Sequence, residues 1–115
     1  MLYHGWSVPG IPAAGTIRYY DAVLRTLGPA TAAATVRLFM VPGMGHCRGG
    51  RGTDTFDPVE ALDRWVRGGA APERIEAARI EDGEVVRTRP LCAYPTRATY
   101  DSDGDSDVSE SFECR

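Results

Sequence analysis

The sequence predicts an α/β fold in which helices cover a parallel sheet, because strand-like apolar runs alternate with segments of helical periodicity. A second observation supports this class. A loop rich in glycine and proline follows each of the first two expected strands, at residues 5–12 and 42–50. Strands joined through helices run parallel, and active residues of such sheets lie in loops beyond the carboxyl ends of the strands. We therefore expect both loops at one edge of the sheet.

The first strand is expected at Leu2–His4, and the loop after it is crowded with turn residues. Gly28 and Pro29 follow a helical pattern over residues 14–27, in the order that ends helices. One amphipathic helix is therefore predicted between the first two strands. Its apolar side chains recur at the three-and-four spacing; they are Ile17, Tyr20, Leu24 and Leu27.

The second strand is expected at residues 35–41, where TVRLFMV is rich in β-branched and aromatic residues and too short for a helix. A second helix is expected from Pro58, because Asp57 can cap it and Glu60 completes an Asp-based capping box. The glycine pair at 68–69 ends it. The apolar face of this helix is expected to consist of Leu62, Trp65 and Val66.

A hairpin is expected at residues 78–88, because two short strand-like runs flank Asp82–Gly83. Residues 89–115 carry scattered turn formers and predict an irregular tail. We therefore divide the chain into a main part, 1–88, and a tail, 89–115.

Composition limits the classes of function. The 115 residues are 43% hydrophobic and 25% charged, as in ordinary globular proteins. The net charge is −3, acidic residues concentrate in 101–115, and the rest forms no basic patch, so we expect no nucleic-acid partner. No run approaches the roughly 20 apolar residues of a membrane span. We expect no membrane partner, no cofactor and no metal, and no signal peptide is visible.

The loop MVPGMGHCRGG places His46 next to Cys47, although the chain has only two histidines and three cysteines. Histidine suits proton transfer near neutral pH, and the surrounding glycines let a loop approach a ligand closely. In esterases of the α/β-hydrolase type, the catalytic acid and histidine follow late strands in that order. The two loops would then be the acid loop and the histidine loop.

Several motifs carry a specific resemblance. LYHGWSVPGIP, RLFMVPGMGHC, ALDRWVRGGAAPE and RTRPLCAYPTRATY, closed by SFEC, resemble consecutive landmarks near the C-terminus of the tannase and feruloyl esterase family. Members are α/β-hydrolases, typically secreted, that hydrolyse esters of aromatic acids such as gallic and ferulic acid. The resemblance implies the C-terminal portion of such an enzyme, an aromatic-acid ester as substrate, pairing with the missing N-terminal part, and a secreted or periplasmic location.

The resemblance also assigns roles to individual residues. His46 matches the catalytic histidine, which acts as general base of a Ser-His-Asp triad. Cys47 matches a cysteine that forms a disulfide to the cysteine immediately before the nucleophilic serine, outside this chain. Cys92 and Cys114 resemble a second, local disulfide that closes the tail.

Two departures from the family pattern lead us to expect that the chain alone is inactive. Val8 stands where the family has its acid, and neither Asp21 nor Asp54 is an obvious replacement. No serine lies in a Gly-x-Ser-x-Gly elbow. The serines present are Ser7, Ser102, Ser106, Ser109 and Ser111. Because MLYHGW opens inside a strand-like segment, we also expect that Met1 does not begin a folding unit.

A non-catalytic relic or a binding module is the alternative. Alternating carboxylates in residues 101–107 invite a calcium site, but Ser106 and Phe112 break the EF-hand register, and a solvated acidic loop is the simpler interpretation. A zinc site formed by His4, His46 and the cysteines would need a spacing that the chain does not have. We expect His4 to be structural.

Overall fold

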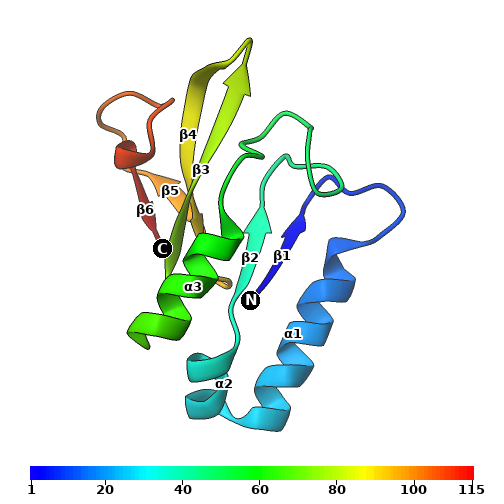
Figure 1. The fold of residues 1–115 in the computed structure, drawn as a ribbon. Helices are drawn as coiled ribbons and strands as arrows, with labels where there is room; N and C mark the ends of the chain where they lie inside the picture. Colours follow the sequence, from blue (N-terminus) through cyan, green and yellow to red (C-terminus); the bar gives the residue numbers. More distant parts are fainter.

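A computed structural model describes all residues, 1–115, and Figure 1 shows its arrangement. The elements in chain order are β1 (Leu2–Gly5), α1 (Ala13–Leu27), α2 (Pro29–Thr35), β2 (Leu38–Val41), α3 (Pro58–Gly68), β3 (Arg74–Glu81), β4 (Glu84–Cys92), β5 (Ala98–Tyr100), the short 3₁₀ helix η1 (Ser109–Ser111) and β6 (Phe112–Cys114). The predicted α/β class is confirmed.

The centre of the fold is the parallel pair β1–β2, in which Leu2 lies opposite Leu38 and Gly5 opposite Val41. β1 pairs with no other strand, so its second edge is open. On the far side of β2, a single bridge joins Phe39 to Ala93, just beyond β4. The parallel pair therefore has one free edge and one edge covered by the hairpin.

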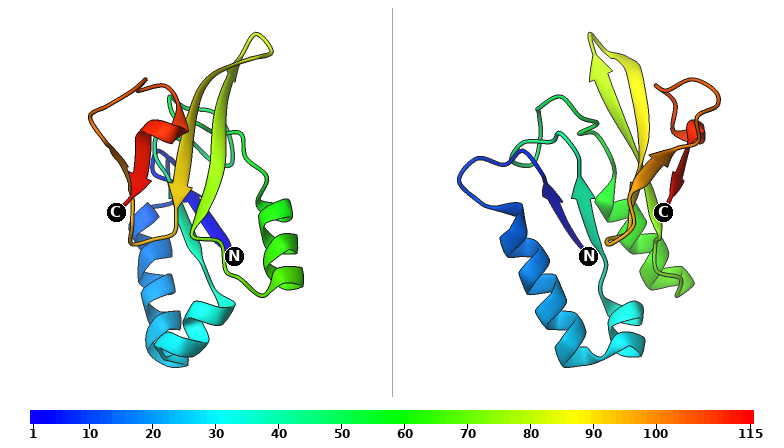
Figure 2. Two further views of the ribbon diagram at one scale, coloured as in Figure 1. Left: turned by 90° about the vertical axis from the view of Figure 1, so that its left-hand side faces the viewer. Right: turned by 180° about the vertical axis from the view of Figure 1, so that it is seen from behind.

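Helices α1 and α3 lie on opposite sides of this pair, as the left view of Figure 2 shows. The four residues of β2 are all buried, and alternate side chains enter different clusters. Leu38 and Met40 pack with Tyr20 of α1, whereas Phe39 and Val41 pack with the β3–β4 hairpin. Burial on both faces explains why this strand reads as a continuous apolar run.

The first helix ends as predicted, because Gly28 adopts a φ of 76° and its N–H donates to the Leu24 carbonyl at 3.0 Å. The sequence predicts no helix after it, yet α2 follows at once. Pro29 occupies the first turn of α2, where its missing N–H costs nothing. Pro29, which the sequence pattern assigns to the end of one helix, therefore starts the next.

Helix α3 begins as predicted, since the Asp57 carboxylate accepts from the Glu60 N–H at 2.8 Å. Its expected apolar face is only partly correct. Trp65 is buried, but Leu62 is 39% and Val66 is 76% exposed. No other element of this chain covers the outer side of α3.

The hairpin turns at Asp82 and Gly83 as predicted, with φ values of 50° and 87°. Its strands are longer than residues 78–88, and β4 continues to Cys92, across the expected boundary at residue 88.

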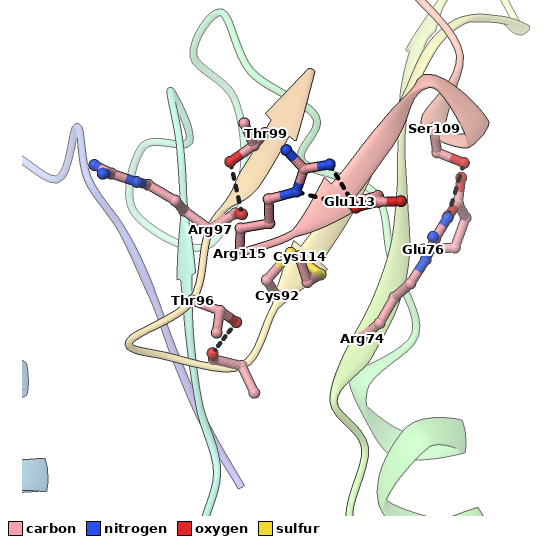
Figure 3. The surroundings of a disulfide bond; sticks show 11 residues. Arg74, Glu76, Cys92, Thr96, Arg97, Thr99, Ser109, Glu113, Cys114 and Arg115 are labelled. Carbon is pink, nitrogen blue, oxygen red and sulfur yellow. Dashed lines mark hydrogen bonds and ion pairs between the residues drawn. A yellow bond between two sulfur atoms is a disulfide. The ribbon is translucent and has the colours of Figure 1, made fainter. Parts of the chain in front are cut away.

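The tail has more regular structure than the sequence predicts, because β5 and β6 form an antiparallel ladder. Cys92 and Cys114 form the disulfide that closes it, with Cα atoms 5.5 Å apart (Figure 3).

Candidate functional site

The histidine loop follows β2 directly. Met44 is buried and anchors the loop, whereas His46 and Cys47 are exposed beyond it. The Gly45 N–H donates to the Gly49 carbonyl at 2.8 Å, so the segment between them forms a tight turn. Cys47 has a φ of 67°, which non-glycine residues adopt infrequently. His46 and Cys47 therefore lie at the exposed tip of a compact turn.

The acid loop lies against the histidine loop, backbone to backbone. The Ser7 N–H donates to the Met44 carbonyl at 3.0 Å. A Cβ on Gly5 would lie 2.3 Å from the Met44 oxygen and 2.5 Å from the Gly45 oxygen. Only glycine allows this approach, and it brings both loops together at the carboxyl ends of β1 and β2.

A pocket of about 170 Å³ lies between the two loops and the start of α1. Val8 and His46 both line it. The lining contains no carboxylate, so no acidic side chain shares this pocket with His46. The lining residues are Tyr3, His4, Gly5, Val8, Ile11, Thr16, Met44, His46 and Cys47.

His4 holds the acid loop to α1. Its Nε2 lies 3.3 Å from the Ile11 carbonyl, and its Nδ1 lies 2.9 Å from the Thr16 hydroxyl. A carbonyl can only accept, so Nε2 carries the proton and Nδ1 accepts from the hydroxyl. Both ring nitrogens are thereby used in structural hydrogen bonds, in line with the structural role expected for this histidine.

Asp54 contacts the backbone of the histidine loop and not the imidazole of His46. Its carboxylate accepts from the Gly49 N–H at 2.7 Å. Asp54 and Cys47 also line a larger, open pocket of about 530 Å³ on the side of Phe56. Asp21 is on α1 and does not line the pocket of His46. The sequence alone does not reveal the contact of Asp54, because a hydrogen bond to a backbone amide leaves no spacing signal.

The structure gives the remaining candidate residues their places. Cys47 is an exposed free thiol, since Cys92 and Cys114 bond to each other. Ser7 lies in the loop that joins β1 to α1, in GWSVP rather than a Gly-x-Ser-x-Gly elbow, and the other four serines lie in the tail. No three histidine, cysteine or acidic side chains converge so that they could hold a metal ion. None of the helices combines the length and apolar character needed to span a bilayer.

Electrostatic perturbation is found in the tail and on α1, away from the pocket. Arg87 donates to the Asp107 carboxylate at 2.6 Å, and this hydrogen bond lowers the pKa of Asp107. Burial raises the pKa of Tyr20, which packs from α1 against β2. Neither residue lines the pocket of His46.

Comparison with known proteins gives consistent results. The family model described as tannase and feruloyl esterase matches residues 1–115. The chain is 44% identical over 119 residues to mono(2-hydroxyethyl) terephthalate hydrolase of Piscinibacter sakaiensis, covering 99% of this chain and 19% of that protein. It is 35% identical to a probable feruloyl esterase of Arthroderma benhamiae, covering 99% of this chain and 22% of that protein.

Solved structures agree with the sequence matches. An esterase from Aspergillus oryzae superimposes with a TM-score of 0.88 at 29% identity, covering 99% of this chain and 27% of that chain. Feruloyl esterase B from Aspergillus oryzae gives a TM-score of 0.85 at 29% identity, with 99% and 26% covered. The chain spans about a fifth to a quarter of the length of the curated relatives it matches. The chain belongs to the tannase and feruloyl esterase family.

Proposed function

We propose that this chain supplies the histidine side of the active site of a serine hydrolase that cleaves carboxylic esters of aromatic acids. One observation carries the proposal: His46 and the position of the family's acid, Val8, line one pocket at the ends of adjacent parallel strands. The relatives support the substrate class, since they include a terephthalate monoester hydrolase, feruloyl esterases and a tannin acyl hydrolase.

In this proposal His46 is the general base. Its imidazole takes the proton of a serine hydroxyl as the serine oxygen attacks the ester carbonyl, and returns that proton to the departing alcohol. Water then attacks the acyl-serine, and the imidazole again accepts and returns one proton. The exposed position of His46 on its turn leaves the ring accessible to a serine supplied from outside residues 1–115.

Val8 limits what the chain can do. A valine cannot accept the imidazole N–H, so nothing at this position fixes the tautomer or stabilises the protonated ring. Replacing the triad acid by its amide in serine proteases costs about 10⁴ in rate. The chain alone, with neither nucleophile nor acid, is proposed to be inactive.

The cysteines fit the same assignment. Cys47 is exposed beside His46, where a disulfide to a cysteine preceding the serine would hold base and nucleophile together. We propose that residues 1–88 are the C-terminal portion of the catalytic domain and that 89–115 form a disulfide-closed tail. Pairing with the missing N-terminal part and a secreted or periplasmic location complete the proposal.

The test is complementation. The N-terminal portion of a close relative is co-expressed with this chain, and hydrolysis of methyl ferulate and methyl gallate is measured. We expect no turnover from the chain alone, and turnover from the pair that His46→Ala abolishes. Turnover that survives His46→Ala in the pair, or turnover by the chain alone that His46→Ala abolishes, would each contradict the proposal.

A non-catalytic relic is the second candidate, and the apolar residue in place of the acid favours it. The same complementation separates the two. A pair that assembles but stays inactive, even when Val8→Asp restores the acid, would identify the chain as a relic or an interaction module.

A further inference from the structure

We propose that Arg79 and Asp54 are positioning residues that hold the histidine loop in a single conformation. In the structure this loop extends over residues 43–53. Five glycines give this loop high conformational freedom; they are Gly43, Gly45, Gly49, Gly50 and Gly52. Buried side chains anchor it only near its two ends, at Met44 and Thr53. The exposed residues between them therefore depend on polar contacts.

Asp54 provides the first contact from a fixed point. The N–H groups of Asp54 and Thr55 donate to the Ala78 carbonyl of β3 at 3.1 and 3.0 Å, and the Ala78 N–H returns a hydrogen bond to Thr55 at 2.7 Å. The backbone of Asp54 is thus attached to the hairpin. From there its negatively charged carboxylate accepts from the Gly49 N–H of the loop at 2.7 Å.

Arg79 provides the second contact, from the neighbouring position on β3. Its Nη1 donates to the Gly50 carbonyl at 2.7 Å and to the Gly52 carbonyl at 3.3 Å. Its Nε donates to Glu81 at 2.7 Å, so the guanidinium is held at both ends. The Arg79 side chain is only 27% exposed.

The two charges act on complementary groups of the loop backbone. The carboxylate holds an N–H at Gly49, and the guanidinium holds carbonyls at Gly50 and Gly52. Hydrogen bonds to charged groups are roughly twice as strong as neutral ones. The positive φ of Cys47 requires such support, because that conformation persists only where the surroundings fix it. The contacts begin two residues after Cys47, at Gly49, and so restrain the turn that carries His46 and Cys47.

Arg74 is a natural control on the same strand. It pairs with Glu76 two residues further on, as Arg79 pairs with Glu81. Its other partner is the Ser109 hydroxyl of the tail, at 3.3 Å, and it contacts no residue of the histidine loop. The two arginines therefore share a carboxylate partner two residues further on and differ in the second partner, which is the tail for Arg74 and the loop for Arg79.

The test compares Arg79→Met with Arg74→Met in the 115-residue chain. Two readouts are the hydrogen-exchange rate of the Gly45 amide, next to His46, and the exchange rate of the Arg51 and Gly52 amides; all three amides bond within the loop. Loss of a hydrogen bond to a charged group predicts that both rates rise by about tenfold or more in Arg79→Met. Arg74→Met should leave both unchanged, and Arg79→Lys should restore part of the protection.

Exchange at the Ala77 and Leu91 amides of the hairpin separates local from global effects. Unchanged loop rates in Arg79→Met would overturn the proposal. Equal acceleration in the loop and the hairpin would also overturn it, since Arg79 would then stabilise the whole fold. The proposal rests on the proposed function only in naming His46 as the residue served. Neither readout requires hydrolysis, so the two proposals fail separately.

Discussion

Val8 and His46 line the same pocket, although they belong to different loops, because Gly5 lets the end of β1 approach the histidine loop closely. A carboxylate at the position of the valine side chain would therefore share the pocket of the imidazole. In the complemented pair, Val8→Asp is expected to raise the rate of ester hydrolysis by about 10²–10⁴. The matched control is Val8→Asn, which has a similar shape but carries no charge and should give a much smaller gain. Equal rates for both variants would show that the position does not serve His46.

The close approach of the two loops at Gly5 can be tested by measuring the free energy of unfolding of a Gly5 variant. Gly5→Ala would place a methyl group 2.3 Å from the Met44 oxygen, so backbone must shift. We expect a loss of about 1–3 kcal/mol in the free energy of unfolding, measured by urea denaturation. Gly15→Ala is the control, because a Cβ at Gly15 of α1 meets nothing within 4 Å. That substitution should stabilise the chain by about 0.4–1 kcal/mol, because alanine narrows the unfolded ensemble without a clash. A neutral Gly5→Ala would mean that the two loops do not pack as described.

The third prediction concerns the contribution of the Cys92–Cys114 disulfide to stability. Cys92 and Cys114 are separated by 22 residues, and closing a loop of this size is worth about 3 kcal/mol in the chain-entropy model. Replacing both by alanine should lower the unfolding free energy by about that amount, whereas Cys47→Ser should leave it unchanged. Thiol labelling with peptide mapping checks the pairing directly. A Cys47 peptide found in an intramolecular bridge would contradict it.

The Arg87–Asp107 pair gives the tail a dependence on pH. The hydrogen bond from Arg87 lowers the pKa of Asp107 in the folded chain, so ionised Asp107 favours folding. Its contribution is present above the unfolded value of about 3.9 and is lost as the pH falls through the lower folded value. Asp107→Asn should reduce the loss of stability between about pH 5 and pH 2, measured by urea denaturation across that range. Asp82→Asn, in the hairpin turn and without an ion pair, should leave the acid profile unchanged.

Local signals of the sequence predict the central elements correctly. The apolar run before the histidine loop predicts β2, and the Asp57 cap and the Asp82–Gly83 turn mark α3 and the hairpin. Elements set by distant contacts are missed. β5 and β6 are three residues each and pair across the tail, beside the disulfide. Helix α2 is missed because Pro29 ends one helical pattern and starts another.

In the candidate site, too, the sequence reveals some residues by local signals and misses those that act through distant contacts. His46 and Cys47 stand out because of their rarity and their glycine-rich surroundings. The contacts of Asp54 and Arg79 with the loop do not, because a side chain bonded to a distant backbone group has no characteristic spacing. Val66 fits an apolar helix face by its position, yet it is exposed, since burial depends on what packs against the helix.

The open edge of β1 leads to the last prediction. β1 pairs only with β2, so its other side presents backbone groups that no strand of the chain satisfies. Large apolar side chains are also exposed, among them Trp6 at 51% and Val59 at 73%. Open strand edges and exposed apolar surface favour association between chains. We therefore expect that the purified chain is marginally stable or aggregates, and that the N-terminal portion of a relative rescues it by supplying the missing neighbours. Size-exclusion chromatography with thermal melting, with and without that portion, measures both effects. A sharp, cooperative melt above about 60 °C from a monomer would show instead that the chain is a self-sufficient fold.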